Sequence, residues 1–209
     1  MTEIPSNNLP PMAAGVISRA KDILLKPKET WPVIAAEPAT TQSIYVPYVV
    51  LLAAIGPLAG FIGGQLFGIS MLGITYHPPL VGALVTAIVT YGLSLATVFI
   101  LALVIDGLAP SFGGQKDQVQ ALKVAAYAGT AGWVGGVFGL IPALGIISLL
   151  FALYGLYLLY LGLPVVMKAP QDKAIGYTVV VIIVYIVLFL IIGAVVGALA
   201  APSLVSIRG

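Results

Sequence analysis

Long apolar stretches without charged residues dominate this chain, and they constrain its fold more than any other feature. A helix that crosses the hydrocarbon core of a bilayer, which is about 30 Å thick, needs roughly 20 such residues. Five stretches approach or exceed that length, at residues 46–68, 80–105, 124–141, 144–167 and 175–201. Because they are continuously apolar and do not alternate, they argue against the strands of a membrane β-barrel. The sequence therefore predicts an all-α, polytopic membrane helix bundle with five transmembrane helices.

Composition agrees with a chain surrounded by lipid. Hydrophobic residues make up 60% of the sequence and charged residues 8%, whereas soluble domains carry about 25% charged residues. Lipid requires no charged coat on the outer face of a bundle, but water does. We divide the chain into a cytoplasmic N-terminal segment (1–44), a five-helix transmembrane domain (45–201) and a C-terminal tail (202–209).

Lysine and arginine residues predict the orientation. If there are five spans, the N-terminal segment and the second and fourth loops share one side of the membrane. That side collects eight basic residues: Arg19, Lys21, Lys26, Lys28, Lys116, Lys123, Lys168 and Lys173. The opposite side has only Arg208. Basic residues stay preferentially in the cytoplasm, so we expect a bacterial inner-membrane protein with its N-terminus inside and its C-terminus outside.

Residues 12–26 have the pattern of an amphipathic helix that ends before Pro27. One arc of this helix is apolar and contains Met12, Val16, Ile17, Ala20, Ile23 and Leu24. The other faces and the residues just beyond carry a membrane-surface basic set of Arg19, Lys21, Lys26 and Lys28. Such a helix is expected to lie in the cytoplasmic leaflet and attract anionic head groups. Packing on the cytoplasmic ends of the bundle is an equal alternative.

Glycines recur at intervals of four residues in several predicted spans. They form a candidate packing or partner face of Gly56, Gly60, Gly64, Gly68, Gly132, Gly136, Gly193 and Gly197. This spacing lets two helix backbones approach closely within a membrane. The glycines are expected to pack helices within one subunit; the alternative is a face for a second copy or another membrane protein.

Hydroxyl side chains follow one face of the second predicted span. They are Thr86, Thr90, Ser94 and Thr97. Such hydroxyls bond to neighbouring helices or to carbonyls of their own helix. A polar path for a transported species is the alternative interpretation.

Tyrosines are spaced by three residues in the fourth predicted span, at Tyr154, Tyr157 and Tyr160. Aromatic packing inside the bundle is one interpretation of this face. A groove for a lipid or another apolar ligand is the other.

Signatures of enzymes are missing from the sequence. It has no cysteine and a single histidine, His77, so it offers neither a thiolate nucleophile nor an evident metal site. Asp106 is the only acidic residue beside a predicted membrane core, which leaves no acid–base pair. We therefore expect a protein without catalytic residues, cofactor or metal, and the net charge of +2 does not suggest a nucleic-acid partner.

Several short motifs give the chain a family resemblance. They read Pro27-Lys28-Glu29-Thr30-Trp31, Gly132-Trp133-Val134-Gly135-Gly136, Leu159-Tyr160-Leu161-Gly162-Leu163-Pro164 and Met167-Lys168-Ala169-Pro170. In their order and spacing the chain resembles the Yip-domain family of Ypt/Rab-interacting membrane proteins, in its bacterial branch, over roughly residues 15–200.

This resemblance implies five spans and a cytoplasmic N-terminus. Eukaryotic members bind small GTPases and one another; their Asp-Leu-Tyr-Gly-Pro motif is absent here. The leading hypothesis is a non-enzymatic scaffold, accessory subunit or partner-binding protein. Its partners would be membrane lipids and other membrane proteins or a second copy. The alternatives are a small transporter or channel subunit and a lipid-handling membrane protein.

Overall fold

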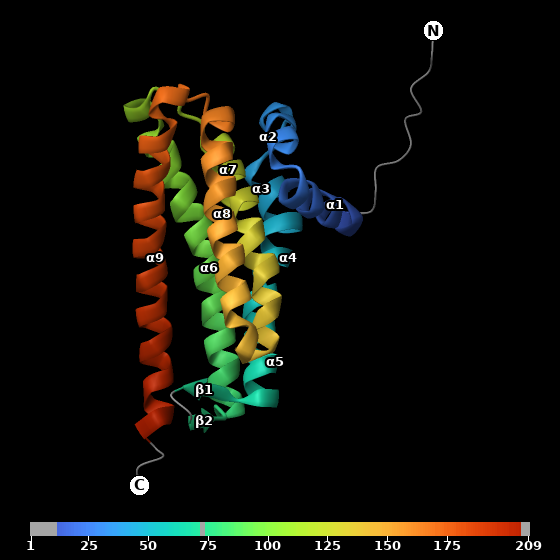
Figure 1. Ribbon diagram of the computed structural model, residues 1–209, viewed down its shortest axis with the longest axis vertical. Helices are drawn as coiled ribbons and strands as arrows, with labels where there is room; N and C mark the ends of the chain where they lie inside the picture. Colours follow the sequence, from blue (N-terminus) through green and yellow to red (C-terminus); the bar gives the residue numbers. More distant parts are fainter. Residues whose placement is uncertain (1–11, 72–73, 206–209) are drawn as a thin grey trace.

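The computed structural model describes residues 12–71 and 74–205, and this part of the chain is almost entirely helical. Two short helices precede the bundle: α1 (Met12–Leu25) and α2 (Pro27–Ala36). α1 projects sideways from the bundle, and α2 lies at its upper end (Figure 1). Arg208 lies outside the described residues.

The first pass through the bundle is an interrupted helix. It consists of α3 (Thr41–Ile44), a π turn (Tyr45–Val49), α4 (Val50–Ala53) and α5 (Ile55–Phe67). The side chain of Thr40 caps its start by accepting a hydrogen bond from the Ser43 amide. Pro47, which has no backbone N–H and interrupts the α-helical ladder, lies within the π turn.

A short antiparallel hairpin follows the first pass. Gly68 ends α5 with a φ of 71°, a left-handed conformation that glycine adopts without strain. The strands β1 (Ile69–Met71) and β2 (Ile74–Tyr76) then pair Ile69 with Tyr76. The hairpin and the end of α9 both lie at the end of the bundle opposite α2 (Figure 1).

The other passes alternate in direction along the same axis (Figure 1). They are α6 (Leu80–Leu108), α7 (Gln118–Gly135), α8 (Gly145–Val166) and α9 (Gln171–Val205). A 3-10 turn, η2 (Ala109–Phe112), extends α6, and two more, η3 (Gly136–Leu140) and η4 (Pro142–Leu144), connect α7 to α8.

The predicted all-α membrane bundle is confirmed at the level of its fold class. In the described part of the chain, four helical segments are long and apolar enough to cross a membrane: Thr41–Phe67, Leu80–Phe112, Gly145–Val166 and Gln171–Ala198. α7, which contains the predicted span 124–141 only in part, is not among them. The fifth span therefore stays a prediction.

The position of α7 explains its modest hydropathy. It packs against α6, α8 and η3, and ten of its 18 residues are buried. A helix surrounded by other helices needs small side chains for close packing more than it needs a lipid-soluble surface. α7 begins six residues before the predicted span, because the Asp117 carboxylate accepts hydrogen bonds from the Val119 and Gln120 amides.

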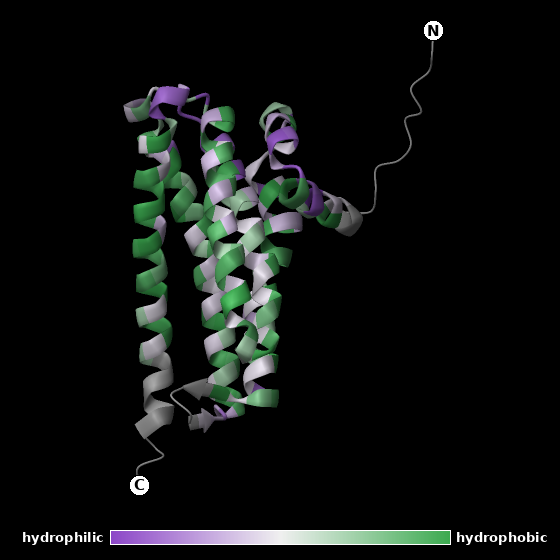
Figure 2. Ribbon diagram, viewed as in Figure 1, coloured by the Kyte–Doolittle hydropathy of each residue, from purple (hydrophilic) through white to green (hydrophobic). Residues whose placement is uncertain are grey.

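Hydrophilic segments gather at one end of the molecule. Figure 2 shows them at α2 and at the connection between α8 and α9, whereas the long faces of α6, α8 and α9 are largely hydrophobic. The connection that leads from η2 into α7 and carries Lys116 lies at this same end.

Candidate functional site

A cavity of about 360 Å³ lies among α6, α7, α8 and α9. Most of its lining is apolar and includes Leu101, Trp133 and Phe189. The polar groups come from α9, through Tyr185, and from one face of α6, at Thr90, Ser94 and Thr97. None of the described residues that line the cavity carries a charge.

The structure thus brings together three of the four predicted hydroxyl residues and leaves Thr86 outside the cavity lining. Two of these hydroxyls donate hydrogen bonds to carbonyl oxygens of their own helix. Ser94 Oγ donates to the Tyr91 carbonyl oxygen and Thr97 Oγ1 to that of Leu93, each at 2.8 Å. Because the lining is largely apolar and carries no charge, the cavity favours an apolar ligand over an ion.

The glycine face of α5 packs against η3. A Cβ atom added to Gly136 would lie 2.8 Å from the Cα atom of Gly56, and one added to Gly63 would lie 2.5 Å from the Gly139 carbonyl oxygen. A Cβ on Gly139 would lie 3.6 Å from the backbone nitrogen of Gly60. These glycines therefore let two backbones meet inside one subunit.

The remaining glycines of the predicted face have other surroundings. A Cβ on Gly64 would make ordinary contacts with Pro78 and Ile69, while Gly68 forms the turn after α5. Gly132 lines the cavity, with open space where a Cβ would lie. Gly193 and Gly197 on α9 also have nothing within 4 Å of an added Cβ.

Two of the motifs that carry the family resemblance meet where α2 packs on α8. Trp31 of α2 is buried, and its ring fills a notch at Gly162. A Cβ atom on Gly162 would lie 2.6 Å from Trp31 Cζ2. Any larger residue at this position would therefore displace the indole ring and with it α2.

Lys123 fixes the other end of α2. Its Nζ atom donates to the carbonyl oxygens of Ile34, at 2.8 Å, and Glu37, at 2.6 Å. Burial lowers the pKa of the Lys123 amine, and the nearby Glu37 and Asp117 carboxylates oppose that shift. The sequence predicted Lys123 as a cytoplasmic charge and did not predict this role. The available signal was its position directly before a run of mostly small residues.

α1 is held on the bundle by one stripe and exposes another. Val16, Ala20 and Ile23 are buried, whereas Ile17 and Leu25 are 70% and 69% exposed. Arg19 forms an ion pair with Glu37, so its charge is already partnered within the protein. The buried stripe fits the prediction that residues 12–26 pack on the bundle. The exposed stripe fits the alternative prediction that they lie in the cytoplasmic leaflet.

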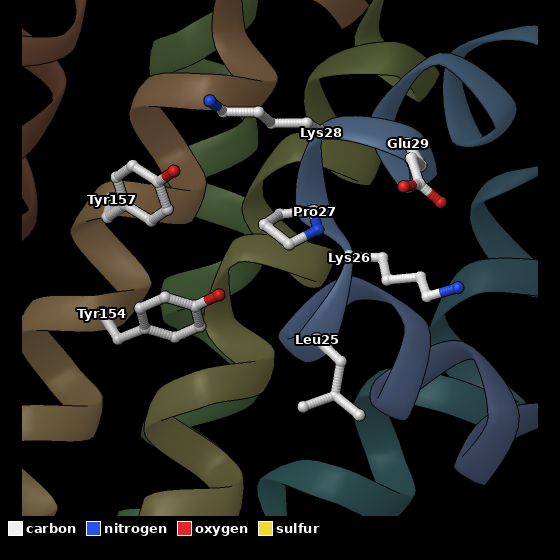
Figure 3. A pocket seen from close by; sticks show the side chains of 7 residues that line it. All are labelled: Leu25, Lys26, Pro27, Lys28, Glu29, Tyr154 and Tyr157. Carbon is white, nitrogen blue, oxygen red and sulfur yellow. The ribbon is translucent and has the colours of Figure 1, made fainter.

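The predicted tyrosine face lies against the α1–α2 junction. Tyr154 Oη donates to the Leu24 carbonyl oxygen at 2.7 Å. Tyr157 and Tyr160 are 42% and 41% exposed. Tyr154 and Tyr157 line a cleft of about 370 Å³ together with Lys26 and Lys28 of the basic set (Figure 3). Two residue sets that were predicted separately therefore share one cleft. Tyr160 and Lys21 do not line it.

Groups with catalytic or metal-binding chemistry are sparse in the described part of the chain. It contains no cluster of three or more histidine and acidic residues that could hold a metal ion. Asp106 is buried, and its Oδ1 atom has no hydrogen-bond partner among the described residues.

Comparison with known proteins assigns the family. The model of the Yip1 domain matches residues 21–193, which is most of the chain. No curated protein and no solved structure matches. The matched region includes α2, the cavity, the cleft on α8 and the Trp31–Gly162 contact. The chain is therefore a member of the Yip1-domain family of membrane proteins.

Proposed function

We propose that this protein crosses a bacterial inner membrane five times, with its N-terminus in the cytoplasm and its C-terminus outside. The alternating direction of the five passes supports this topology (Figure 1). The gathering of α2 and the lysine-bearing connections at one end supports the orientation. In this arrangement α1 lies at the cytoplasmic interface with Ile17 and Leu25 open to lipid.

The function that the geometry supports best is that of a non-enzymatic accessory protein that holds the acyl chain of a membrane lipid inside its bundle. The observation that carries this proposal is the largely apolar cavity among α6, α7, α8 and α9. Its volume of about 360 Å³ lies within the range of about 300–1,000 Å³ found for ligand sites. A lipid chain would fill it with dispersion contacts that an empty cavity lacks.

The same cavity disfavours the transporter alternative. An ion that entered it would lose its hydration shell and meet no charged side chain, because the described lining is uncharged. The hydroxyls of Ser94 and Thr97 remain bonded to α6 itself. We therefore assign the hydroxyl face of α6 to the proposed lipid site.

Two glycine variants test the lipid site. Gly132 and Gly193 both have open space around an added Cβ, but only Gly132 lines the cavity. Gly132→Leu is expected to fill the cavity and remove the co-purifying lipid, while Gly193→Leu retains it. Native mass spectrometry after gentle extraction measures bound lipid directly. Equal lipid content in the wild type and Gly132→Leu would refute the site.

A second candidate function is a scaffold that associates through α9. Gly193 and Gly197 form a close-packing motif with no neighbour within 4 Å of an added Cβ, which leaves that face available to a second copy or another membrane protein. Gly193→Leu is then expected to abolish crosslinked dimers or partner complexes, whereas Gly132→Leu keeps them. A wild type that is monomeric and without partners in mild detergent would eliminate this candidate.

A further inference from the structure

The cleft on α8 has one wall of aromatic side chains and one wall formed by the junction of α1 and α2. The first wall contains Tyr154 and Tyr157, and the second runs from Leu25 to Glu29. Figure 3 shows both tyrosine hydroxyls directed toward the junction, with the amine of Lys28 above Tyr157. The charged ends of Lys26 and Glu29 lie on the far side of the junction in the same view.

Polar groups in this cleft are available to a ligand. Lys28 is exposed and pairs with no acidic side chain in the described ranges. The hydroxyl of Tyr157 likewise forms no hydrogen bond to the described residues, in contrast to that of Tyr154, which donates to Leu24. An ammonium group and a free phenolic O–H are donors for the oxygens of a phosphate.

The two walls are fixed relative to each other. Trp31 in the notch at Gly162 holds the middle of α2 on α8, and Lys123 holds the end of α2 through two backbone carbonyls. The rings of Tyr154 and Tyr157 pack on each other, with centroids 5.7 Å apart. A ligand would therefore meet a cleft whose two walls are preorganised, which lowers the entropy cost of binding.

The surroundings of the cleft select the kind of ligand. Leu25, which lines it, is 69% exposed, and Ile17 on the same helix is 70% exposed. One wall of the cleft includes the start of α2, and α2 lies at the hydrophilic end of the bundle, next to the long apolar faces that fit a bilayer (Figure 2). An anionic group beside apolar surface is the chemistry of a phospholipid at the membrane interface.

We propose that this cleft binds the phosphate head group of an anionic phospholipid, with Lys28 and Tyr157 as donors and Leu25 beside the start of the acyl chains. This head-group site uses the outer face of α8 and is separate from the cavity, which uses Gly155 and Leu159 of the same helix. It would fasten the α1–α2 region to the leaflet.

The test uses the full-length protein in nanodiscs of phosphatidylcholine with or without phosphatidylglycerol. Native mass spectrometry of the released protein measures how many phosphatidylglycerol molecules remain bound. Lys28→Ala is expected to weaken retention about tenfold and Tyr157→Phe about fivefold, in line with the loss of a charge-assisted and a neutral hydrogen bond. Lys116→Ala removes the same charge from an exposed position outside the cleft and is expected to retain the lipid.

Three results would overturn the proposal. The first is unchanged retention in Lys28→Ala, and the second is an equal loss in Lys116→Ala, which would indicate a diffuse charge effect. The third is displacement of phosphatidylglycerol by inorganic phosphate, which would make the cleft a site for free anions. Gly132→Leu, which fills the cavity, is expected to leave head-group retention intact, so that failure of one lipid site does not decide the other.

Discussion

Among single residues, Lys123 stands out because it is buried, unlike the other lysine and arginine residues in the described part of the chain. Only 2% of the residue is exposed, yet its amine lies at the C-terminal end of α2, where helix carbonyls lack partners and the helix dipole is negative. Its bonds to Ile34 and Glu37 satisfy two of those carbonyls. Lys123 thus acts as a cap supplied by another helix.

Lys123→Met should loosen α2 while leaving the bundle assembled. The variant keeps the length of the side chain but leaves two backbone carbonyls without a donor, at a cost of about 2–4 kcal/mol in the free energy of unfolding. Hydrogen exchange in α2 is expected to accelerate far more than exchange in α8. Equal protection of α2 in both proteins would contradict the capping role.

The stability of the wild type should also depend on pH through this residue. Because the folded-state pKa of Lys123 is below the ordinary 10.5, the unfolded chain binds more protons between the two values. The free energy of unfolding therefore rises as the pH increases through the folded-state pKa toward 10.5. Denaturant titrations at several pH values measure this change in the free energy of unfolding, which should differ between the wild type and Lys123→Met. The same pH dependence in both proteins would exclude a contribution from Lys123.

Between elements, the contact of α5 with η3 shows how glycines at the same sequence spacing serve different purposes. Gly136→Ala places a methyl group against the Gly56 backbone and is expected to destabilise the bundle by about 1–3 kcal/mol. Gly132→Ala, four residues earlier, enters open space and should be neutral or stabilising by up to about 1 kcal/mol. The two variants are compared by titration with dodecyl sulfate, with helix content followed by circular dichroism. A similar loss of stability in Gly136→Ala and Gly132→Ala would contradict this packing.

Sequence patterns located the long helices better than the contacts between them. Apolar stretches located α6, α8 and α9 because lipid contact demands unbroken hydrophobicity. The same criterion worked less well for α7, whose neighbours are helices and whose surface is therefore less apolar. Periodicity placed Thr90, Ser94 and Thr97 on one face, but the cavity beside them also needs Trp133 and Tyr185 from other helices. The meeting of Trp31 with Gly162 could not be derived from spacing, because no local pattern specifies a distant contact.

For the whole molecule, the number of spans decides where each loop lies. The sequence contains no cysteine, so Lys116→Cys, Lys173→Cys and His77→Cys each provide a single label site. With five spans, an impermeant maleimide applied to spheroplasts should label only His77→Cys, and all three should react after permeabilisation. If α7 did not cross, Lys116→Cys and Lys173→Cys would lie on opposite sides, and the labelling would distinguish them.

The last helix is the least buried of the four candidate spans. Within an 18-residue apolar stretch of this helix only 6% is buried, compared with 22–28% in the corresponding stretches of the three other candidate spans. Its described buried side chains lie near its start, between Ala174 and Val181, where Tyr177 stacks on Phe112. We therefore expect its lower half to separate from the bundle more readily than this anchored start. A chain held behind Phe189 would then exchange sideways with the bilayer, and its residence time would follow the opening rate of α9 rather than the unfolding rate of the protein.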